Sequence, residues 1–429
     1  MESKDRTKIR FINGMRTIGG TFIEVTKGKD RIIFDCGAEF HPELEEQPQE
    51  LEDILECELA PFIEGIYDKR IELSNYKDRN DPYENTAIFV SHIHLDHSKM
   101  INFIDPSLDV YMSNDSKKLL EAINEKDFLY ENNFLKTKTR AIKGVEYYRK
   151  VQIGKISVTM IPVDHDCYGA VGFIIQTDDL KISYTGDIRL HGFRQKDTID
   201  FIEKSKNSDY LISEGVSVSF NEFSDEIESP HTEDELIDNV LDIIDKNPNR
   251  QITFSYYISN IERILKLIEK SKRQIVLDSY YAYVLKKVKA IDVSYYDVSN
   301  KDYGLREDLR VDIKDLLQDK KRYLRQFNKS VDKYIDAMLD GGIYLHLDAE
   351  PLGEFDPYYE VFIKRFEDRN IEFKPIKCSG HAYPKDLLKI INGIKPRILV
   401  PIHSFRPEKL FNENGETILP MKNQILGGI

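Results

Sequence analysis

The stretch Ser91-His92-Ile93-His94-Leu95-Asp96-His97 holds three of the ten histidines of this 429-residue chain and one aspartate. The apolar, partly β-branched run Ala87–Val90 precedes it and predicts a buried strand. Residues two apart on an extended backbone point the same way, so His92 and His94 can converge on one ion. The aspartate and histidine that follow lie past the strand end and can face a second position. Because imidazole nitrogen and carboxylate oxygen bind Zn²⁺ and Mn²⁺, the stretch predicts a metal site rather than a His-rich surface loop.

The bulk composition predicts an ordinary globular chain of two or three domains. Charged residues make up 32% and apolar residues 41%, which is ordinary for a soluble globular protein. The N-terminus lacks the apolar core of a signal peptide, and no run approaches the roughly 18 apolar residues of a membrane span. We therefore expect no membrane partner.

Cysteine usage and net charge limit the cellular compartment and the kinds of binding partner that we expect. The four cysteines form no CxxC pair, which argues against a disulfide framework or a thiolate zinc site and predicts a cytoplasmic protein. The net charge of −14 counts mildly against nucleic acid as a partner, because such binding neutralises phosphates. One basic groove on an acidic protein is nevertheless enough.

The two halves of the chain differ in their pattern of predicted helices and strands. The first 200 residues are strand-rich, with strands expected near 20–26, 31–34, 151–163 and 171–184. Beyond them helix-like and strand-like segments alternate, including a long charged helix expected over 316–340, which is typical of a parallel α/β sheet. No Gly-, Ser- or Pro-rich linker separates the halves, which favours an insertion over two domains in series.

Two further candidates follow predicted strands in the first half. His165 comes after the apolar run Val158–Pro162, where a loop should begin. A catalytic ion held by two histidines needs a third protein ligand and one open position for water, so His165 suits that role better than that of a plain loop residue. Asp187 ends a strand in Thr185-Gly186-Asp187, and it is either a turn aspartate or a carboxylate that bridges two metals.

Two more histidines end predicted strands near the C-terminus, in Cys378-Ser379-Gly380-His381-Ala382 and in Pro401-Ile402-His403-Ser404. Six of the ten histidines thus stand in loops after strands, which chance explains poorly. We interpret the other four, His41, His191, His231 and His346, as ordinary.

The order of these features along the chain is similar to that of one family. The His-x-His-x-Asp-His stretch is followed by His165, Thr185-Gly186-Asp187, an α/β region, Ser379-Gly380-His381 and Pro401-Ile402-His403. This ordered set resembles the β-CASP group of metallo-β-lactamase-fold nucleases, and within it the ribonuclease J branch. Further segments that resemble the family are Asn13–Thr21, Ile33–Gly37, Leu211–Gly215 and Ser259–Arg263. Taken together, the resemblance covers nearly the whole chain.

The resemblance implies a two-metal site with an assigned role for each residue. The first metal would be held by His92, His94 and His165. The second metal would be held by Asp96, His97 and His403, and Asp187 would bridge the two metals. Asp96 would also take part in catalysis. His381 would contact the phosphate and act as general acid, and Glu214 would orient His381. Ser379 and Gly380 would donate hydrogen bonds to the phosphate. Asp35 would hold the metal ligands in place from behind.

The resemblance also implies an α/β fold in which an α/β β-CASP domain is inserted into a metallo-β-lactamase αββα sandwich. The expected parts are the first part of the metallo-β-lactamase domain over 1–205, the β-CASP domain over 206–373, and the completion of the first domain over 374–429. One departure is Ser404-Phe405, where ribonuclease J has Gly-Glu. Another is Asp166, which replaces the usual serine after His165.

We therefore predict a metal-dependent ribonuclease that hydrolyses phosphodiester bonds of RNA, single-stranded RNA being favoured, with a hydroxide activated by two divalent ions. Zn²⁺ is expected ahead of Mn²⁺ as the cofactor. The alternatives are a β-CASP DNA nuclease, a small-molecule metallo-hydrolase and a non-catalytic RNA-binding scaffold. No oligomeric state is predicted.

Possible substrate contacts are less specific than the metal ligands. The basic side chains that are candidates to line a phosphate backbone are Lys136, Lys138, Arg140, Lys143, Arg189, Arg194 and Lys196. The tyrosines that are candidates to stack on bases are Tyr256, Tyr257, Tyr280, Tyr281 and Tyr283. For both sets an ordinary solvated face or core position is the favoured interpretation.

Overall fold

The computed structural model describes residues 6–41, 44, 48–77, 82–127, 140–220, 231–299, 301–327, 338–348 and 356–427. None of the helices in these ranges is long and apolar enough to cross a membrane.

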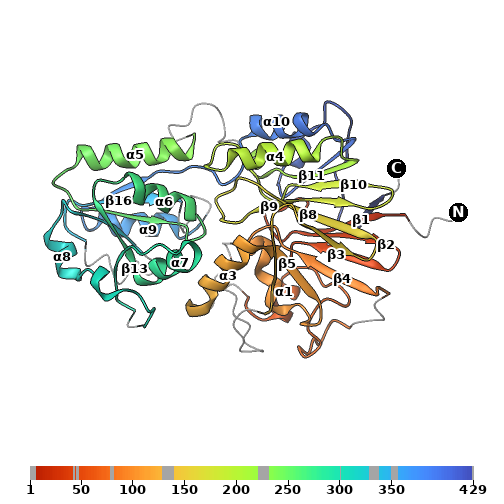
Figure 1. Ribbon diagram of the computed structural model, residues 1–429, viewed down its shortest axis with the longest axis horizontal. Helices are drawn as coiled ribbons and strands as arrows, with labels where there is room; N and C mark the ends of the chain where they lie inside the picture. Colours follow the sequence, from red (N-terminus) through yellow and green to blue (C-terminus); the bar gives the residue numbers. More distant parts are fainter. Residues whose placement is uncertain are drawn as a thin grey trace.

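Two seven-stranded sheets form the larger body of the molecule, on the right of Figure 1. In spatial order the first sheet contains β20 (Gln424–Gly427), β1 (Lys8–Asn13), β2 (Phe22–Lys27), β3 (Asp30–Phe34), β4 (Asn85–Phe89), β5 (Asp109–Ser113) and β6 (Lys143–Val145). The second contains β19 (Glu416–Thr417), β18 (Ile398–Ile402), β11 (Tyr210–Glu214), β10 (Lys181–Tyr184), β9 (Val171–Gln176), β8 (Ile156–Pro162) and β7 (Lys150–Ile153).

The two sheets pack face to face through apolar side chains. Phe11 and Phe34 of the first sheet meet Phe173 and Ile182 of the second in one buried cluster. Helices cover the outer faces: α1 (Leu51–Glu56) and α3 (Asn114–Asp127) the first sheet, α4 (Gln195–Ser205) and α10 (Pro384–Ile394) the second. The layers are therefore helix, sheet, sheet and helix, the predicted αββα sandwich.

A third, all-parallel sheet forms the smaller body on the left of Figure 1. Its spatial order is β14 (Ser294–Tyr296), β13 (Gln274–Asp278), β15 (Tyr323–Gln326), β12 (Ile252–Tyr256), β16 (Ile343–Leu347) and β17 (Glu372–Pro375). The helices of this body are α5 (Glu233–Lys246), α6 (Ile261–Lys270), α7 (Ser279–Lys289), α8 (Ile313–Gln318) and α9 (Tyr359–Glu367). Every strand pair is parallel, as the alternation of helices and strands predicts.

The third sheet is inserted into the second. β11 and β18 are adjacent parallel strands, with Tyr210 opposite Ile398, yet every strand of the third sheet lies between them in the sequence. The chain therefore leaves the sandwich after β11, builds the smaller body, and returns as β18. The predicted fold class, a sandwich with an inserted α/β domain, is confirmed. We call the smaller body the inserted domain.

One predicted element is wrong. The charged helix expected over 316–340 is broken, because α8 ends at Gln318 and β15 runs over Tyr323–Gln326. β15 lies between β13 and β12 in the inserted sheet, and its four residues are buried. Pairing on both sides outweighs the helical preference of a charged segment, and that pairing is not a local property of the sequence. Residues 328–337 lie outside the described ranges.

Candidate metal centre

The predicted ligands gather at one edge of the sandwich because each follows the end of a strand. His92 and His94 follow β4, and the chain then turns into the short helix α2 (Leu95–Ser98), which carries the next two ligands. His165 follows β8, and Asp187 follows β10. His403 follows β18 in a left-handed conformation (φ +51°), with its backbone N–H donating to the Gly14 carbonyl at 2.7 Å.

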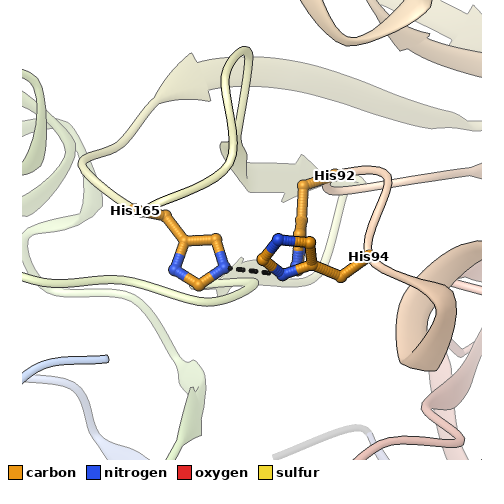
Figure 2. A group of neighbouring side chains, drawn as sticks. All are labelled: His92, His94 and His165. Carbon is orange, nitrogen blue, oxygen red and sulfur yellow. Dashed lines mark hydrogen bonds between the residues drawn. The ribbon is translucent and has the colours of Figure 1, made fainter. Parts of the chain in front are cut away.

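Three histidines form a first group, His92, His94 and His165, which Figure 2 shows with their rings turned toward one another. One ring nitrogen from each lies within 4.8 Å of the others. His165 Nε2 and His94 Nδ1 lie 3.2 Å apart. His92 Nε2 is buried and has no hydrogen-bond partner among the described residues.

The other ring nitrogen of each histidine in this group has a partner of its own. His92 Nδ1 lies 3.0 Å from Ser91 Oγ, and His165 Nδ1 donates to the Gly380 carbonyl at 2.6 Å. His94 Nε2 lies 3.1 Å from Ser259 Oγ. Such contacts fix the tautomer and leave the inward nitrogen with a lone pair for a metal.

A second group consists of Asp96, His97, Asp187 and His403, whose ligand atoms also lie within 4.8 Å of one another. His97 Nε2 is 3.3 Å from Asp187 Oδ1, and His403 Nε2 is 3.4 Å from Asp96 Oδ2. The other oxygen of Asp187 lies 3.6 Å from His92 Nε2 in the first group. Asp187 therefore stands between the groups with one oxygen toward each.

The donor atoms fit two small divalent cations. Ligand atoms around a tetrahedral ion with bonds of about 2.0–2.1 Å are about 3.3–3.4 Å apart, close to the separations within both groups. His97 Nε2, Asp187 Oδ1 and both ring nitrogens of His403 are buried without a hydrogen-bond partner in the described part of the chain. Buried polar atoms left unpaired carry a free-energy penalty that a bound cation would remove.

Asp35 lies behind both groups, fully buried. Its carboxylate accepts from His97 Nδ1 at 2.8 Å and from the Tyr184 hydroxyl at 2.6 Å. It also accepts from the backbone N–H and the hydroxyl of Ser91 at 2.7 and 3.0 Å. Since Ser91 Oγ in turn contacts His92, one carboxylate orients a histidine from each group.

Electrostatics keep three members of the centre in their metal-binding protonation states. Burial, reinforced by His97 and the other nearby histidines, holds the pKa of His92 well below its usual value. Burial also lowers the pKa of His165 to about 3. For Asp187, burial raises the pKa, but the surrounding histidines outweigh it and hold the pKa well below its usual value. Neutral imidazoles and an ionised carboxylate are the forms that bind metals.

His381 lies at the rim of the centre, where its Nδ1 is 3.3 Å from Glu214 Oε1 and 3.7 Å from Asp187 Oδ2. Burial lowers its pKa, but Glu214 and Asp187 outweigh that effect and raise the pKa to about 9. Glu214 is itself fixed, because Oε2 accepts from the Val216 backbone N–H at 2.9 Å. The pair can hold a proton next to the two groups.

The loop before His381 is held in place by hydrogen bonds within the loop and by hydrogen bonds from neighbouring side chains. The Ser379 hydroxyl donates to the His381 carbonyl at 2.8 Å and accepts from the His381 backbone N–H at 3.1 Å. The Ser379 carbonyl accepts from Arg189 Nη1 at 2.9 Å and from His191 Nε2 at 2.8 Å. His191, which sequence reasoning left as ordinary, thus holds this loop and stacks on Tyr383 with ring centroids 4.3 Å apart.

Five of the twelve suggested substrate contacts have structural roles instead. Arg189 is buried and paired with Asp164 and Glu233, so it does not form a phosphate track. Four of the five tyrosines are buried and belong to the core: Tyr256, Tyr280, Tyr281 and Tyr283. The fifth, Tyr257, is half-buried and lies edge-on to His94 with ring centroids 5.4 Å apart. Lys136 and Lys138 lie outside the described residues.

Two family models match the chain. One is described as a β-lactamase superfamily domain and covers residues 30–233. The other is described as the RNA specificity domain of Zn-dependent metallo-hydrolases and covers residues 368–409. The matched ranges contain all seven members of the two groups and also His381.

Curated relatives include two proteins named ribonuclease J. That of Mycoplasma pneumoniae is 22% identical over 433 residues, which cover 93% of this chain and 68% of the relative. That of Mycoplasma genitalium is 22% identical over 278 residues, covering 64% of this chain and 44% of the relative. A crystal structure of a protein of unknown function from Enterococcus faecalis V583 is 41% identical, with a TM-score of 0.89, and the match covers 98% of this chain and 100% of that one.

Proposed function

The chain belongs to the metallo-β-lactamase superfamily of metal-dependent hydrolases, in its β-CASP, ribonuclease J-like branch, and from this premise we propose that it is a ribonuclease. It hydrolyses phosphodiester bonds of RNA, with single-stranded RNA favoured. The observation that carries the proposal is the pair of ligand groups sharing Asp187, with His381 and Glu214 at the rim. We place the inserted β-CASP domain between β11 and β18, close to the range of about 206–373 expected from the sequence, with parts of the sandwich domain on either side.

The ligands would serve two divalent cations. The first group of three histidines would hold one ion, and Asp96, His97 and His403 would hold the other, with one carboxylate oxygen of Asp187 available to each. Zn²⁺ is favoured because the set is rich in imidazole, and Mn²⁺ also suits it. When bound, two such ions acidify a water molecule and offset the charge that develops on the phosphate.

The protein's own groups supply position and a proton. His381, held by Glu214, contacts the scissile phosphate and protonates the departing oxygen, a general-acid step that contributes about 10²- to 10⁴-fold in rate. The backbone at Ser379 and Gly380 borders the phosphate, while the Ser379 hydroxyl keeps the loop in shape. Asp35 keeps His97 in the tautomer that presents Nε2 inward.

RNA is preferred to DNA as the substrate on two grounds. The model that matches residues 368–409 is named for RNA specificity, and both curated relatives are named ribonuclease J. The region it covers contains His381 and His403, so the part of the chain related to RNA specificity also completes the metal centre.

The test is digestion of 5′-labelled single-stranded RNA and of DNA with the same sequence, with Zn²⁺ or Mn²⁺ added. We expect RNA cleavage that is lost in Asp96→Ala/His97→Ala and kept in the control His231→Ala/Asp368→Ala, whose side chains are exposed. Preferred cleavage of DNA would make the chain a DNA nuclease. Cleavage of neither polymer by protein carrying two metal equivalents would point to a small-molecule substrate.

A further inference from the structure

One histidine of the first group is held by the inserted domain rather than by the sandwich. His94 Nε2 lies 3.1 Å from Ser259 Oγ, and Ser259 stands just before α6. We propose that Ser259 is a positioning residue for the first metal and that the inserted domain is thereby part of the metal centre. This inference rests on the two-metal site proposed above.

The geometry assigns opposite tasks to the two ring nitrogens of His94. Nδ1 faces His165 Nε2 at 3.2 Å, inside the first group, whereas Nε2 faces Ser259. When Nε2 carries the proton and donates to the serine hydroxyl, Nδ1 keeps its lone pair for the metal. The other tautomer would place a proton on Nδ1 and prevent metal binding there.

The partner of His94 differs in origin from those of its neighbours. His92 is held by Ser91, its predecessor in the chain, and His165 by Gly380 in the returning segment. Both partners lie outside the inserted sheet and its helices. Within the first group, Ser259 is therefore the contact through which the inserted domain can control the tautomer of a ligand.

Ser259 is well placed to hold a ring in one orientation because it is itself fixed. It is buried, and its carbonyl accepts from the Tyr168 backbone N–H at 2.9 Å, in the loop that follows His165. The next residue, Asn260, caps α6 by accepting from the Arg263 backbone N–H at 3.2 Å. The hydroxyl thus sits between a helix start and the loop of another ligand.

The arrangement links metal binding to the docking of the inserted domain. If closure of the domain orients His94 for the metal, the bound metal must favour closure by the same free energy, since coupling between two equilibria is reciprocal. Loss of an outer hydrogen-bond partner of a metal-binding histidine typically weakens metal affinity 10- to 100-fold. We expect Ser259→Ala to have that effect on the first metal only.

The experiment is metal content after equilibration at a series of buffered free Zn²⁺ concentrations, measured by elemental analysis. Wild-type protein should hold two equivalents, and in Ser259→Ala one of them should need about 10- to 100-fold more free Zn²⁺. Ser259→Thr, which keeps a hydroxyl, should restore most of the affinity. Ser205→Ala is the matched control, because that serine is buried and its hydroxyl has no partner within the described residues.

The outcomes separate the inference from the function on which it rests. Equal Zn²⁺ affinity in wild type and Ser259→Ala would overturn the role of Ser259 and leave the metal site intact. Wild-type protein that binds no divalent ion would overturn the metal site itself. Weakening of both equivalents, together with a lower unfolding midpoint of the metal-free variant, would show a general defect in folding and also overturn the specific role.

Discussion

At the scale of single residues, four of the five histidine rings in the two groups are held through one nitrogen, whereas neither nitrogen of the fifth ring, His403, has a hydrogen-bond partner among the described residues. Asp187 differs from the rings, since its two oxygens face the two groups separately. Asp187→Asn removes the shared negative charge between two cations, so we predict loss of at least one metal equivalent. Elemental analysis would show this, and Asp238→Asn on the exposed face of α5 should keep both equivalents.

His381 should separate catalysis from metal binding. Its Nδ1 lies beside Glu214, and none of the roles proposed for it requires a bond to metal. We predict that His381→Ala keeps both metal equivalents and lowers kcat for RNA cleavage by about 10²- to 10⁴-fold. Full activity in this variant would refute the acid assignment. His231→Ala, an exposed histidine, should change neither quantity.

The sequence was more informative about ligands than about the residues that orient them. The seven ligand candidates could be named because each stands at the end of a recognisable strand, where side chains reach a common edge. Ser259 and His191 could not, because each meets its partner only after distant segments have docked. A serine before a helix predicts a cap, and nothing local distinguishes it from one that holds a metal ligand.

At the scale of elements, a buried charge cluster joins the inserted domain to the sandwich. Glu233, in the first turn of α5, accepts from Arg263 of α6 at 2.8 and 2.9 Å. It also pairs with Arg189 of the sandwich at 3.0 Å, and Arg189 supports the loop that carries His381. Removing one partner from such a buried cluster leaves the others uncompensated.

The pH dependence of this cluster has a definite sign. Burial raises the pKa of Glu233, but Arg263 and Arg189 outweigh it and lower the pKa to about 2, from an ordinary value of 4.5. Because the folded-state pKa is the lower one, the stabilisation from Glu233 is complete above pH 4.5 and is lost as the pH falls toward 2.

We therefore predict that Glu233→Gln lowers the free energy of unfolding by roughly 3–5 kcal/mol at pH 7 and flattens its fall on acidification. Urea unfolding between pH 7 and pH 3 would measure both effects. The control Glu269→Gln breaks an exposed pair with Lys266 and should leave the free energy of unfolding almost unchanged, because water screens exposed ion pairs. A parallel shift of the whole curve, with unchanged slope, would contradict the assigned pKa.

The prediction of secondary structure failed where pairing between strands outweighed the local preference of the sequence for a helix. The charged segment after α8 has a helical pattern, yet β15 occupies the middle of the inserted sheet. The strand-rich first half was easier, because alternating apolar residues on β2 and β9 already indicate sheet faces. Which strands become neighbours, such as β11 and β18, is fixed by contacts between residues far apart in the chain.

At the scale of the whole molecule, metal binding should stabilise the fold, because its ligands come from both sheets of the sandwich. A cation that binds only the folded state adds about 2.7 kcal/mol at a concentration of 100 times its Kd. We predict that a chelator lowers Tm and that Zn²⁺ restores it, as scanning calorimetry would show. In Asp96→Ala/His97→Ala the shift should be much smaller, and an equal shift would mean that the ions bind elsewhere.

The overall architecture could be inferred because the pattern of predicted helices and strands changes near residue 200 without a linker, which favours an insertion. That the chain returns to the sandwich could not be read from this pattern and followed from the family resemblance. The relative position of the two bodies, and hence the contact between His94 and Ser259, follows from packing across their interface. The Tyr280 hydroxyl, which donates to the Ile123 carbonyl of α3 at 2.9 Å, is part of that interface.

The parallel pairing of β11 with β18 has a consequence for biosynthesis. A ribosome releases β11 long before β18, so the nascent second sheet has an unpaired edge while the inserted domain emerges and folds. His403 arrives immediately after β18, which means that the second metal position is among the last features to be completed. Translation that stops before residue 398 would therefore leave a protein with an aggregation-prone edge and an unfinished metal centre.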